Sequence, residues 1–288
     1  MASLRDIRRR IGSVKNTRKI TRAMKLVAGA KMRKAEQAAR AAQPYQNTLR
    51  SVLGRVIAAE DSIEHPLLSQ PENTQDILLV VHSSDRGLCG SFNAQITKFA
   101  LKQKALYEDD GKRVKFLAYG RKIISALKSQ GCEFVHDQMH CKPEDFVSIS
   151  NDLGAKLIEL LNENAFEKVI ICFNQFVSVM VQEPIAKQIL PMQLDADESA
   201  TGAAGEYLYA PNGKEILSDL LPRSLRSQLL QSFLDTEAGE QSARMQAMDS
   251  ATNNAGDMID KLSLIYNRAR QAAITTELTE IISGAEAL

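Results

Sequence analysis

Apolar residues recur every three or four positions through the first part of the chain, which is the spacing of one face of an α-helix. The stripe consists of Leu4, Ile7, Ile11, Val14, Ile20, Met24, Val27, Ala35, Ala42, Leu49, Val52 and Val56. It predicts one helix from Ser3 to about Ala58, roughly 80 Å long at about 1.5 Å per residue. Gly12 and Gly29 weaken this helix, and Pro44 should bend it. Because no globular core of this size can cover so long a helix, it requires a partner helix.

The last part of the chain carries a second long helical pattern that supplies this partner. No proline follows Pro222. The positions that keep the rhythm are Leu225, Leu229, Phe233, Met245, Met248, Thr252, Ala255, Ile259, Leu262, Ile265, Ile274, Leu278 and Ile281. A spacing of about 3.5 residues over such a span predicts that the terminal helices form an antiparallel, left-handed coiled coil. Its seam is rich in small and flexible side chains, so each turn contributes modest stability.

Between the terminal patterns, the periodicity changes to that of strands alternating with helices. We expect strands at 76–82, 114–119, 168–173 and 177–181, and helices at 91–107, 121–130 and 143–162. The continuous apolar run from Asp76 to His82 is typical of a parallel strand buried on both faces. The alternation predicts the α/β class, with a Rossmann-like, mainly parallel sheet inserted between the terminal helices.

These patterns divide the chain into three segments. An N-terminal coiled-coil helix spans 1–58, an α/β domain spans 74–205, and a C-terminal coiled-coil helix with its lead-in spans 206–288. The polar, Gly- and Ala-rich stretch from Leu194 to Gly205 is predicted to be a mobile loop.

The net charge is only +1, but the charges are unevenly distributed. From Met1 to Arg40 basic residues dominate, and the only acids are Asp6 and Glu36. From Arg223 onward acids are in excess. A basic, acid-poor start could imitate a mitochondrial transit peptide, but the helical pattern continues well past the length of one. No apolar run approaches the length of a membrane span.

The four cysteines lack the CxxC spacing of redox and zinc motifs, which indicates free thiols in a reducing compartment. They are Cys89, Cys132, Cys141 and Cys172. Two of them, with His136 and His140, form a local group of residue types that bind metals. This spacing is not that of a zinc motif, and the flanking pattern predicts a strand running into a loop. We therefore interpret Cys132, His136, His140 and Cys141 as surface residues.

The segment SDRGLCGSFN, Ser84–Asn93, follows a buried strand and opens a helix. Backbone N–H groups at such a position can bind phosphate. The spacing is neither GxGxxG nor a P-loop, so we interpret Gly87 and Gly90 as a tight turn. Asp85, Arg86 and Asn93 would satisfy the loop or contact a partner. Neither GxSxG nor HExxH occurs in the chain, and no cofactor is predicted.

The basic run Lys31–Lys34 has three readings on charge. It could contact nucleic-acid phosphates, form a solvated helix face, or meet acidic loops of a protein partner. The charges alone do not favour any one of these three interpretations.

Three segments in order resemble the gamma subunits of F-type ATP synthases, and the resemblance covers nearly the whole chain. They are Ile11–Lys34 (IGSVKNTRKITRAMKLVAGAKMRK), the SDRGLCGSFN loop, and Leu264–Ala287 (LIYNRARQAAITTELTEIISGAEA). The resemblance implies a non-catalytic rotor subunit in the central stalk of a proton-translocating ATP synthase. ATP would be made or hydrolysed at beta-subunit sites.

The resemblance also implies the partners: the alpha and beta subunits of the catalytic head, the epsilon subunit and the membrane c-ring. It implies neither nucleic acid nor a small-molecule substrate. The location implied is peripheral, on the cytoplasmic face of a bacterial inner membrane. A nucleic-acid-binding protein with a basic arm is the alternative, and an enzyme using the α/β domain is a second.

Residue roles follow from the resemblance by position. Met24, Arg270 and Gln271 would meet beta-subunit loops, and Arg33 and Lys34 would face acidic beta loops. Further candidates are helix or loop partners of the N-terminal segment (Thr275, Glu277, Glu280), weaker epsilon or c-ring contacts (Glu206, Tyr207, Tyr209), and an apolar end in the collar of the head (Ile281 to Leu288).

Overall fold

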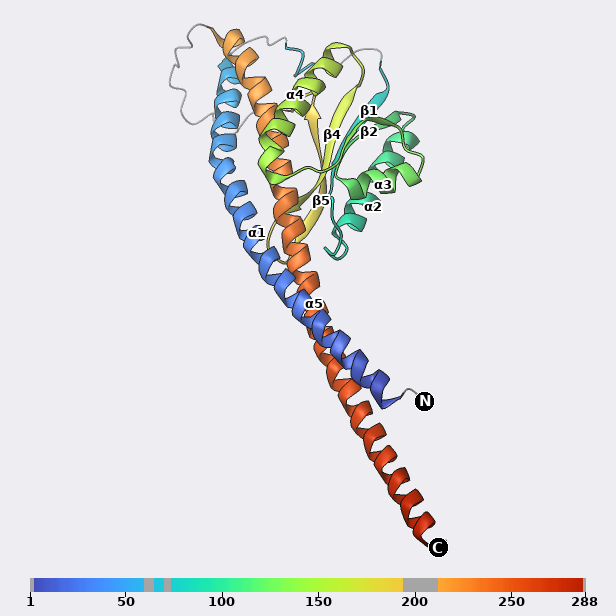
Figure 1. The fold of residues 1–288 in the computed structure, drawn as a ribbon. Coiled ribbons are helices and arrows are strands. Elements are labelled where there is room, and N and C mark those ends of the chain that lie inside the picture. Colours follow the sequence, from blue (N-terminus) through green and yellow to red (C-terminus); the bar gives the residue numbers. More distant parts are fainter. Residues whose placement is uncertain (1–2, 60–64, 70–73, 194–211, 287–288) are drawn as a thin grey trace. The chain divides into compact units, whose positions relative to one another are not determined.

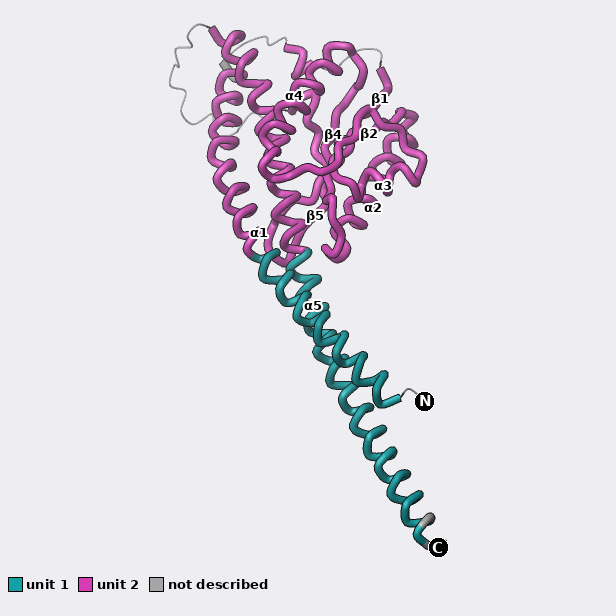
Figure 2. Tube along the Cα trace, in the orientation of Figure 1, with its two compact units in different colours: residues 1–29, 244–288 teal, residues 30–243 magenta. Residues whose placement is uncertain are grey.

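The computed structural model describes residues 3–59, 65–69, 74–193 and 212–286 (Figure 1). It divides into two compact units (Figure 2). The helical unit comprises Met1–Gly29 and Arg244–Leu288, and the sheet unit comprises Ala30–Ala243. Each terminal helix contributes to both units. The segment boundaries expected from the sequence, 1–58, 74–205 and 206–288, stay a prediction.

The elements follow the order expected from the periodicity. The helices are α1 (Leu4–Ala59), α2 (Phe92–Asp109), α3 (Arg121–Ser129), α4 (Phe146–Asn162) and α5 (Gly213–Glu286). The strands are β1 (Asp76–His82), β2 (Arg113–Tyr119), β3 (Phe134–Gln138), β4 (Lys168–Phe176) and β5 (Gln182–Leu190). A single 3-10 turn, Pro143–Asp145, precedes α4. The strand expected to run into a loop near Cys132 is β3.

The strand expected at 177–181 is wrong. Those residues connect β4 to β5, and the Val181 N–H donates to the backbone oxygen of Ser178 at 3.2 Å. The apolar residues Val177 and Val181 imitate a strand, but both are exposed. The real strand, β5, has the sequence QEPIAKQIL, which shows no clear period of two and contains Pro184. Proline is tolerated there because β5 lies at the edge of the sheet.

The sheet has the strand order β3-β2-β1-β4-β5. Pairs among the first four strands are parallel, and β5 pairs with β4 antiparallel. The sheet is thus mainly parallel, as predicted, with one antiparallel edge strand.

Burial on both faces explains the continuous apolar run of β1. Ile77, Leu79 and Val81 pack on one face with residues of α2 and α3. Leu78 and Val80 pack on the other face with residues of α1, α4 and α5. Figure 1 shows α2 and α3 on the side of the sheet opposite α4.

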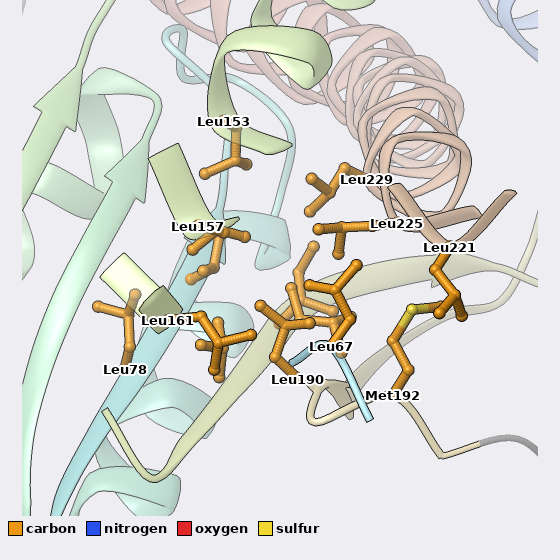
Figure 3. Packing of buried hydrophobic residues seen from close by; sticks show 14 of the residues in the cluster. Leu67, Leu78, Leu153, Leu157, Leu161, Leu190, Met192, Leu221, Leu225 and Leu229 are labelled. Carbon is orange, nitrogen blue, oxygen red and sulfur yellow. The ribbon is translucent and has the colours of Figure 1, made fainter. Parts of the chain in front are cut away.

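The larger core lies between α4 and the first part of α5. Leu157 and Leu161 of α4 lie beside Leu225 and Leu229 of α5 (Figure 3). Leu190, at the end of β5, joins the same cluster. This interlocked packing holds the start of α5 on the sheet unit.

Helix α5 begins before Pro222 because its start is capped. The Asn212 side-chain oxygen accepts from the Glu215 backbone N–H at 2.8 Å, and its amide donates to the Glu215 carboxylate at 2.9 Å. This reciprocal cap satisfies polar groups at the helix start. Pro222 is therefore inside the helix.

Within the helical unit, α1 and α5 pair in one antiparallel register. The Thr252 hydroxyl donates to the Thr21 hydroxyl at 2.8 Å, and Lys25 Nζ lies 2.7 Å from Asp249 Oδ1. The numbers of these facing residues add up to 273 and 274. The predicted antiparallel coiled coil is confirmed.

Candidate functional site: the paired terminal helices and the strand-end loop

The last turns of α5 extend past the described start of α1. Because facing numbers add up to 273 or 274, Leu4 at the start of α1 lies opposite a position near Arg270. Figure 2 shows α5 continuing beyond that point within the helical unit. Residues 271–286 therefore have no described counterpart on α1.

This unpaired segment carries an exposed apolar stripe. Ile274, Leu278, Ile281 and Ile282 are 48%, 55%, 67% and 58% exposed. Their spacing of four, three and one positions keeps them on one helix face. A contiguous exposed apolar surface marks an interaction site.

The polar residues singled out on α5 lie along the same segment. Arg270, Gln271, Glu277 and Glu280 are exposed. Thr275 is exposed too, and its hydroxyl donates to the Gln271 backbone oxygen at 3.0 Å. In the observed register, Thr275, Glu277 and Glu280 lie beyond Leu4, so their side chains are available to a partner.

On α1, the residues singled out differ in exposure. Met24 is partly buried in the helical unit. Arg33 and Lys34, in the sheet-unit part of α1, are exposed, so their charges are available to an acidic partner. Glu206, Tyr207 and Tyr209 lie outside the described residues.

The SDRGLCGSFN loop is held by its own side chains. Asn93 Oδ1 accepts from the hydroxyls of Ser83 at 2.7 Å and Ser84 at 2.8 Å. The Asn93 amide donates to the Arg86 backbone oxygen at 3.3 Å. Gly90 has a φ of +58°, a conformation that favours glycine. The expected turn is present at Gly90 but not at Gly87, and Asn93 satisfies polar groups of the loop itself.

Asp85 ties this loop to the ends of the neighbouring strands. Its carboxylate accepts from the backbone N–H groups of Arg121 at 2.8 Å and His140 at 3.1 Å. Because the carboxylate faces these N–H groups, the end of the parallel sheet already holds a negative charge. A bound phosphate would be repelled there, which argues against the phosphate-binding reading.

A small cavity at this end of the sheet is lined by His82, Tyr119, Cys141, Phe233 and Glu240, among others. Burial lowers the pKa of His82 to about 3, so its imidazole is neutral. Burial also raises the pKa of the Cys141 thiol to about 12, which leaves it protonated and unreactive.

In the sequence, His82 is only the last residue of the apolar run that predicts a strand, whereas the structure joins it to Ser232 of α5, 150 positions away. No local signal could have shown this contact.

The metal-ligand types near β3 do not form a metal site. Within the described ranges, no group of three or more His, Cys, Asp or Glu side chains is arranged to hold a metal ion. Cys132, Cys141 and the other two cysteines are free. Among the helices that the structure describes, none is long and apolar enough to cross a membrane.

The fold is that of chains solved within ATP synthase central assemblies. A chain of the Euglena gracilis mitochondrial ATP synthase OSCP/F1/c-ring assembly superposes with a TM-score of 0.67 at 17% identity, covering 99% of this chain and 94% of that chain. A chain of the Tetrahymena thermophila mitochondrial ATP synthase central stalk/c-ring superposes with a TM-score of 0.56 at 20% identity, covering 81% and 99%.

Sequence relatives extend this likeness over the full length. A family model described as ATP synthase matches residues 3–288. The ATP synthase gamma chain of Paracoccus denitrificans is 44% identical over 295 residues, and that of Brucella ovis is 42% identical over 292, each covering 100% of both chains. The chain belongs to the family of ATP synthase gamma chains.

Proposed function

We propose that this chain is the central-stalk rotor subunit of a proton-translocating ATP synthase. It carries torque from a membrane c-ring to the catalytic head of alpha and beta subunits. The observation that carries the proposal is the full-length match to gamma chains, with a paired helical unit whose last turns present an unpaired apolar stripe.

The chain is non-catalytic in this proposal. ATP is made or hydrolysed at beta-subunit sites, which the rotor drives by presenting a different face to each site in turn. A site that meets a different surface at each rotor angle shifts its population of conformations, because the contacts differ in free energy.

Contacts of the helical unit would be of two kinds. Met24, Arg270 and Gln271 meet loops of the beta subunits, where hydrogen bonds to charged groups hold one rotor angle and release in the next. The apolar stripe from Ile274 to Ile282 lies against the surrounding head. An apolar contact has no directional bonds to break during a turn, so it suits a bearing.

Arg33 and Lys34 would face acidic beta-subunit loops. Thr275, Glu277 and Glu280, which lie beyond the start of α1, would contact loops of the head. The sheet unit would rest on the c-ring with the epsilon subunit, and Glu206 and Tyr207 are candidates for that contact. The chain would therefore be peripheral, on the cytoplasmic face of a bacterial inner membrane.

Nucleic-acid binding by the basic part of α1 receives no support from the comparisons, whose matches are ATP synthase chains. It would show as steeply salt-dependent binding of DNA or RNA to the full chain.

Purification of the tagged full chain from native membranes tests the proposal. We expect the alpha, beta, epsilon and c-ring subunits to co-purify in an assembly that hydrolyses ATP. Recovery of the chain without alpha and beta subunits, or bound instead to nucleic acid, would refute the rotor function.

The double substitution Arg270→Ala and Gln271→Ala tests the proposed beta contact. Both side chains are exposed, so the fold should be retained, whereas proton-driven ATP synthesis or assembly should be impaired. Lys214→Ala, at the exposed start of α5, is the control and should leave synthesis unchanged. Normal proton-driven synthesis in the double variant would remove these residues from the contact.

A further inference from the structure

His82, the last residue of β1, contacts two consecutive residues of α5. Its Nδ1 lies 3.2 Å from the hydroxyl oxygen of Ser232. Its ring stacks on Phe233, with centroids 3.9 Å apart and planes at 20°. Tyr119, at the end of β2, packs edge-on against the same imidazole at 5.5 Å. The central strand is thus joined to α5 by one polar and one aromatic contact.

The hydrogen bonds of Ser232 determine which nitrogen of His82 carries the proton. The Ser232 hydroxyl donates to the Leu229 backbone oxygen at 2.6 Å, which uses its one hydrogen. The hydroxyl oxygen therefore accepts at His82, and His82 must donate from Nδ1–H. In this tautomer Nε2 carries a lone pair, and it has no hydrogen-bond partner among the described residues.

The imidazole stays neutral because the effect of burial on its pKa outweighs that of the hydrogen bond with Ser232, which acts to raise the pKa. Burial lowers the pKa of His82 to about 3. The groups that face the adjoining cavity are Asp85 of the loop, Tyr119 of β2, Cys141 before α4, and Glu237 and Glu240 of α5. A neutral donor keeps the same bond through the physiological pH range.

Apolar packing fixes which face of α5 is buried, and a directional contact adds to it a steep dependence on small rotations of the helix about its own axis. The leucines of α5 against α4 contribute free energy that depends on buried area and not on direction. A hydrogen bond weakens steeply when its angle changes. The bond from His82 to Ser232 is of this second kind.

Two further contacts of α5 with the sheet unit also depend on the orientation of the helix. The Ser242 hydroxyl donates to the Val179 backbone oxygen in the β4–β5 connection. A Cβ atom at Gly239 would lie 3.0 Å from the Phe92 ring, so the helix approaches α2 closely at this point. Ser232, Gly239 and Ser242 occupy a stretch of α5 in which several polar residues are buried.

We propose that His82 is a positioning residue that sets the rotational orientation of α5 on the sheet unit, by donating from Nδ1–H to Ser232 and stacking on Phe233. The inference rests on the proposed rotor function: torque passing between α5 and the sheet unit would load this contact together with the apolar packing of the helix. The bond keeps the two turning together.

Single-molecule rotation of the assembled complex tests the proposal. The head is immobilised and stalled, and a probe on the exposed side of α3 reports the angular fluctuations of the sheet unit. Ser232→Ala and His82→Phe each remove the hydrogen bond, and the phenyl ring keeps an aromatic partner for Phe233. Both variants should broaden the fluctuations of the stalled complex, and the rate of ATP hydrolysis by the complex that is free to turn should be unchanged.

The matched control is Ser218→Ala. This exposed hydroxyl on α5 donates to the Lys214 backbone oxygen of its own helix, so its loss should leave the fluctuations as in the unmodified complex. The variant carrying both His82→Phe and Ser232→Ala should fluctuate no more than either single variant, because the two changes remove one shared bond. Unchanged fluctuations in both single variants, or strictly additive broadening in the double variant, would overturn the proposal. If the unmodified complex does not rotate, that result contradicts the proposed rotor function and does not contradict the bond from His82 to Ser232.

If a variant does not assemble, nitrogen-15 NMR of the full chain labelled at histidine tests whether His82 is neutral and donates from Nδ1–H. One of the four histidines should remain neutral with a protonated Nδ1 down to pH 5, and its signal should be absent in His82→Phe. A protonated Nε2 with bare Nδ1, or a charged ring, would contradict the bond to Ser232.

Discussion

Among single residues, Asp235 of α5 is a carboxyl whose ionisation opposes folding. Burial raises its pKa from 3.8 to about 6, although the Gln231 amide donates to it at 3.0 Å. A raised carboxyl pKa means that the folded state binds the proton more tightly than the unfolded chain. Stability is therefore lost as pH rises from about 4 through about 6.

Asp235→Asn should accordingly stabilise the chain at pH 7 by about 2 kcal/mol, with no gain below about pH 4. Urea unfolding of both chains at a series of pH values measures the difference. Asp260→Asn, at an exposed position of the same helix, serves as the control. A stability difference that does not change between pH 4 and pH 7 would contradict the assigned burial.

Thr21 and Thr252 form a polar pair in the small-residue seam of the helical unit. The Thr252 hydroxyl lies 2.8 Å from that of Thr21, which is only 8% exposed. Thr21→Val or Thr252→Val should each destabilise the chain by about 1 kcal/mol, because each change removes the hydrogen bond between the two hydroxyls.

The double Val variant should cost less than the two single changes together, since both single changes remove the same hydrogen bond. A double-mutant cycle in denaturant measures this coupling. Additive losses would show that the two hydroxyls do not act as a pair.

At the scale of elements, glycines in the two long helices differ in what surrounds them. Gly12 of α1 is exposed, and a Cβ there would meet nothing within 4 Å. Gly239 of α5 is buried, and a Cβ there would lie 3.0 Å from the Phe92 ring and 3.3 Å from Gln182. The same substitution should therefore act in opposite directions.

Gly12→Ala should stabilise the chain by about 1 kcal/mol through helix propensity. Gly239→Ala should destabilise it by about 1–3 kcal/mol, because α2 or β5 must shift. Chemical denaturation of the two variants measures both effects. A stabilised Gly239→Ala variant would mean that α5 does not seat closely on α2.

At the scale of the whole molecule, two truncations of α5 separate the proposed roles of its last turns. One removes only residues after Arg270 and Gln271, and the other removes these two residues as well. Deletion of 281–288 removes exposed apolar surface beyond the start of α1, so we expect a mild loss of coupled ATP synthesis. Deletion from 268 onward also removes the polar residues proposed to contact beta loops, and it should cause a much larger loss.

ATP hydrolysis and proton-driven synthesis by membranes carrying each truncation measure the contrast. The unpaired part of α5 then acts as a bearing, and the polar residues act as the coupling contact. Equal losses in the two truncations would contradict this division of roles.

Much of the fold could be predicted because its signals are local. The three–four spacing of Leu4, Ile7 and Ile11 predicts a helix whatever lies beside it, and the unbroken apolar run of β1 predicts burial on both faces. The connection at Val177–Val181 was misread as a strand because its apolar residues are exposed on a turn, and exposure is not a local property.

Candidate residues on α1 and α5 were found through resemblance to gamma subunits, and the structure shows that the described ones on α5 are exposed and that all of them except Arg270 lie beyond the start of α1. The role of His82 was missed because a single histidine at the end of a strand carries no local signal.

The amino-acid order by itself determined the two long terminal helices, their need for each other and the α/β character of the segment between them. Periodicity and backbone propensity act over a few residues and do not depend on distant neighbours. Only the tertiary structure decided the register of Thr21 with Thr252, the burial of Asp235 and the donation from His82 to Ser232. Each of these depends on which two surfaces meet, and residues as far apart as 150 or 231 positions can meet only once the chain has folded.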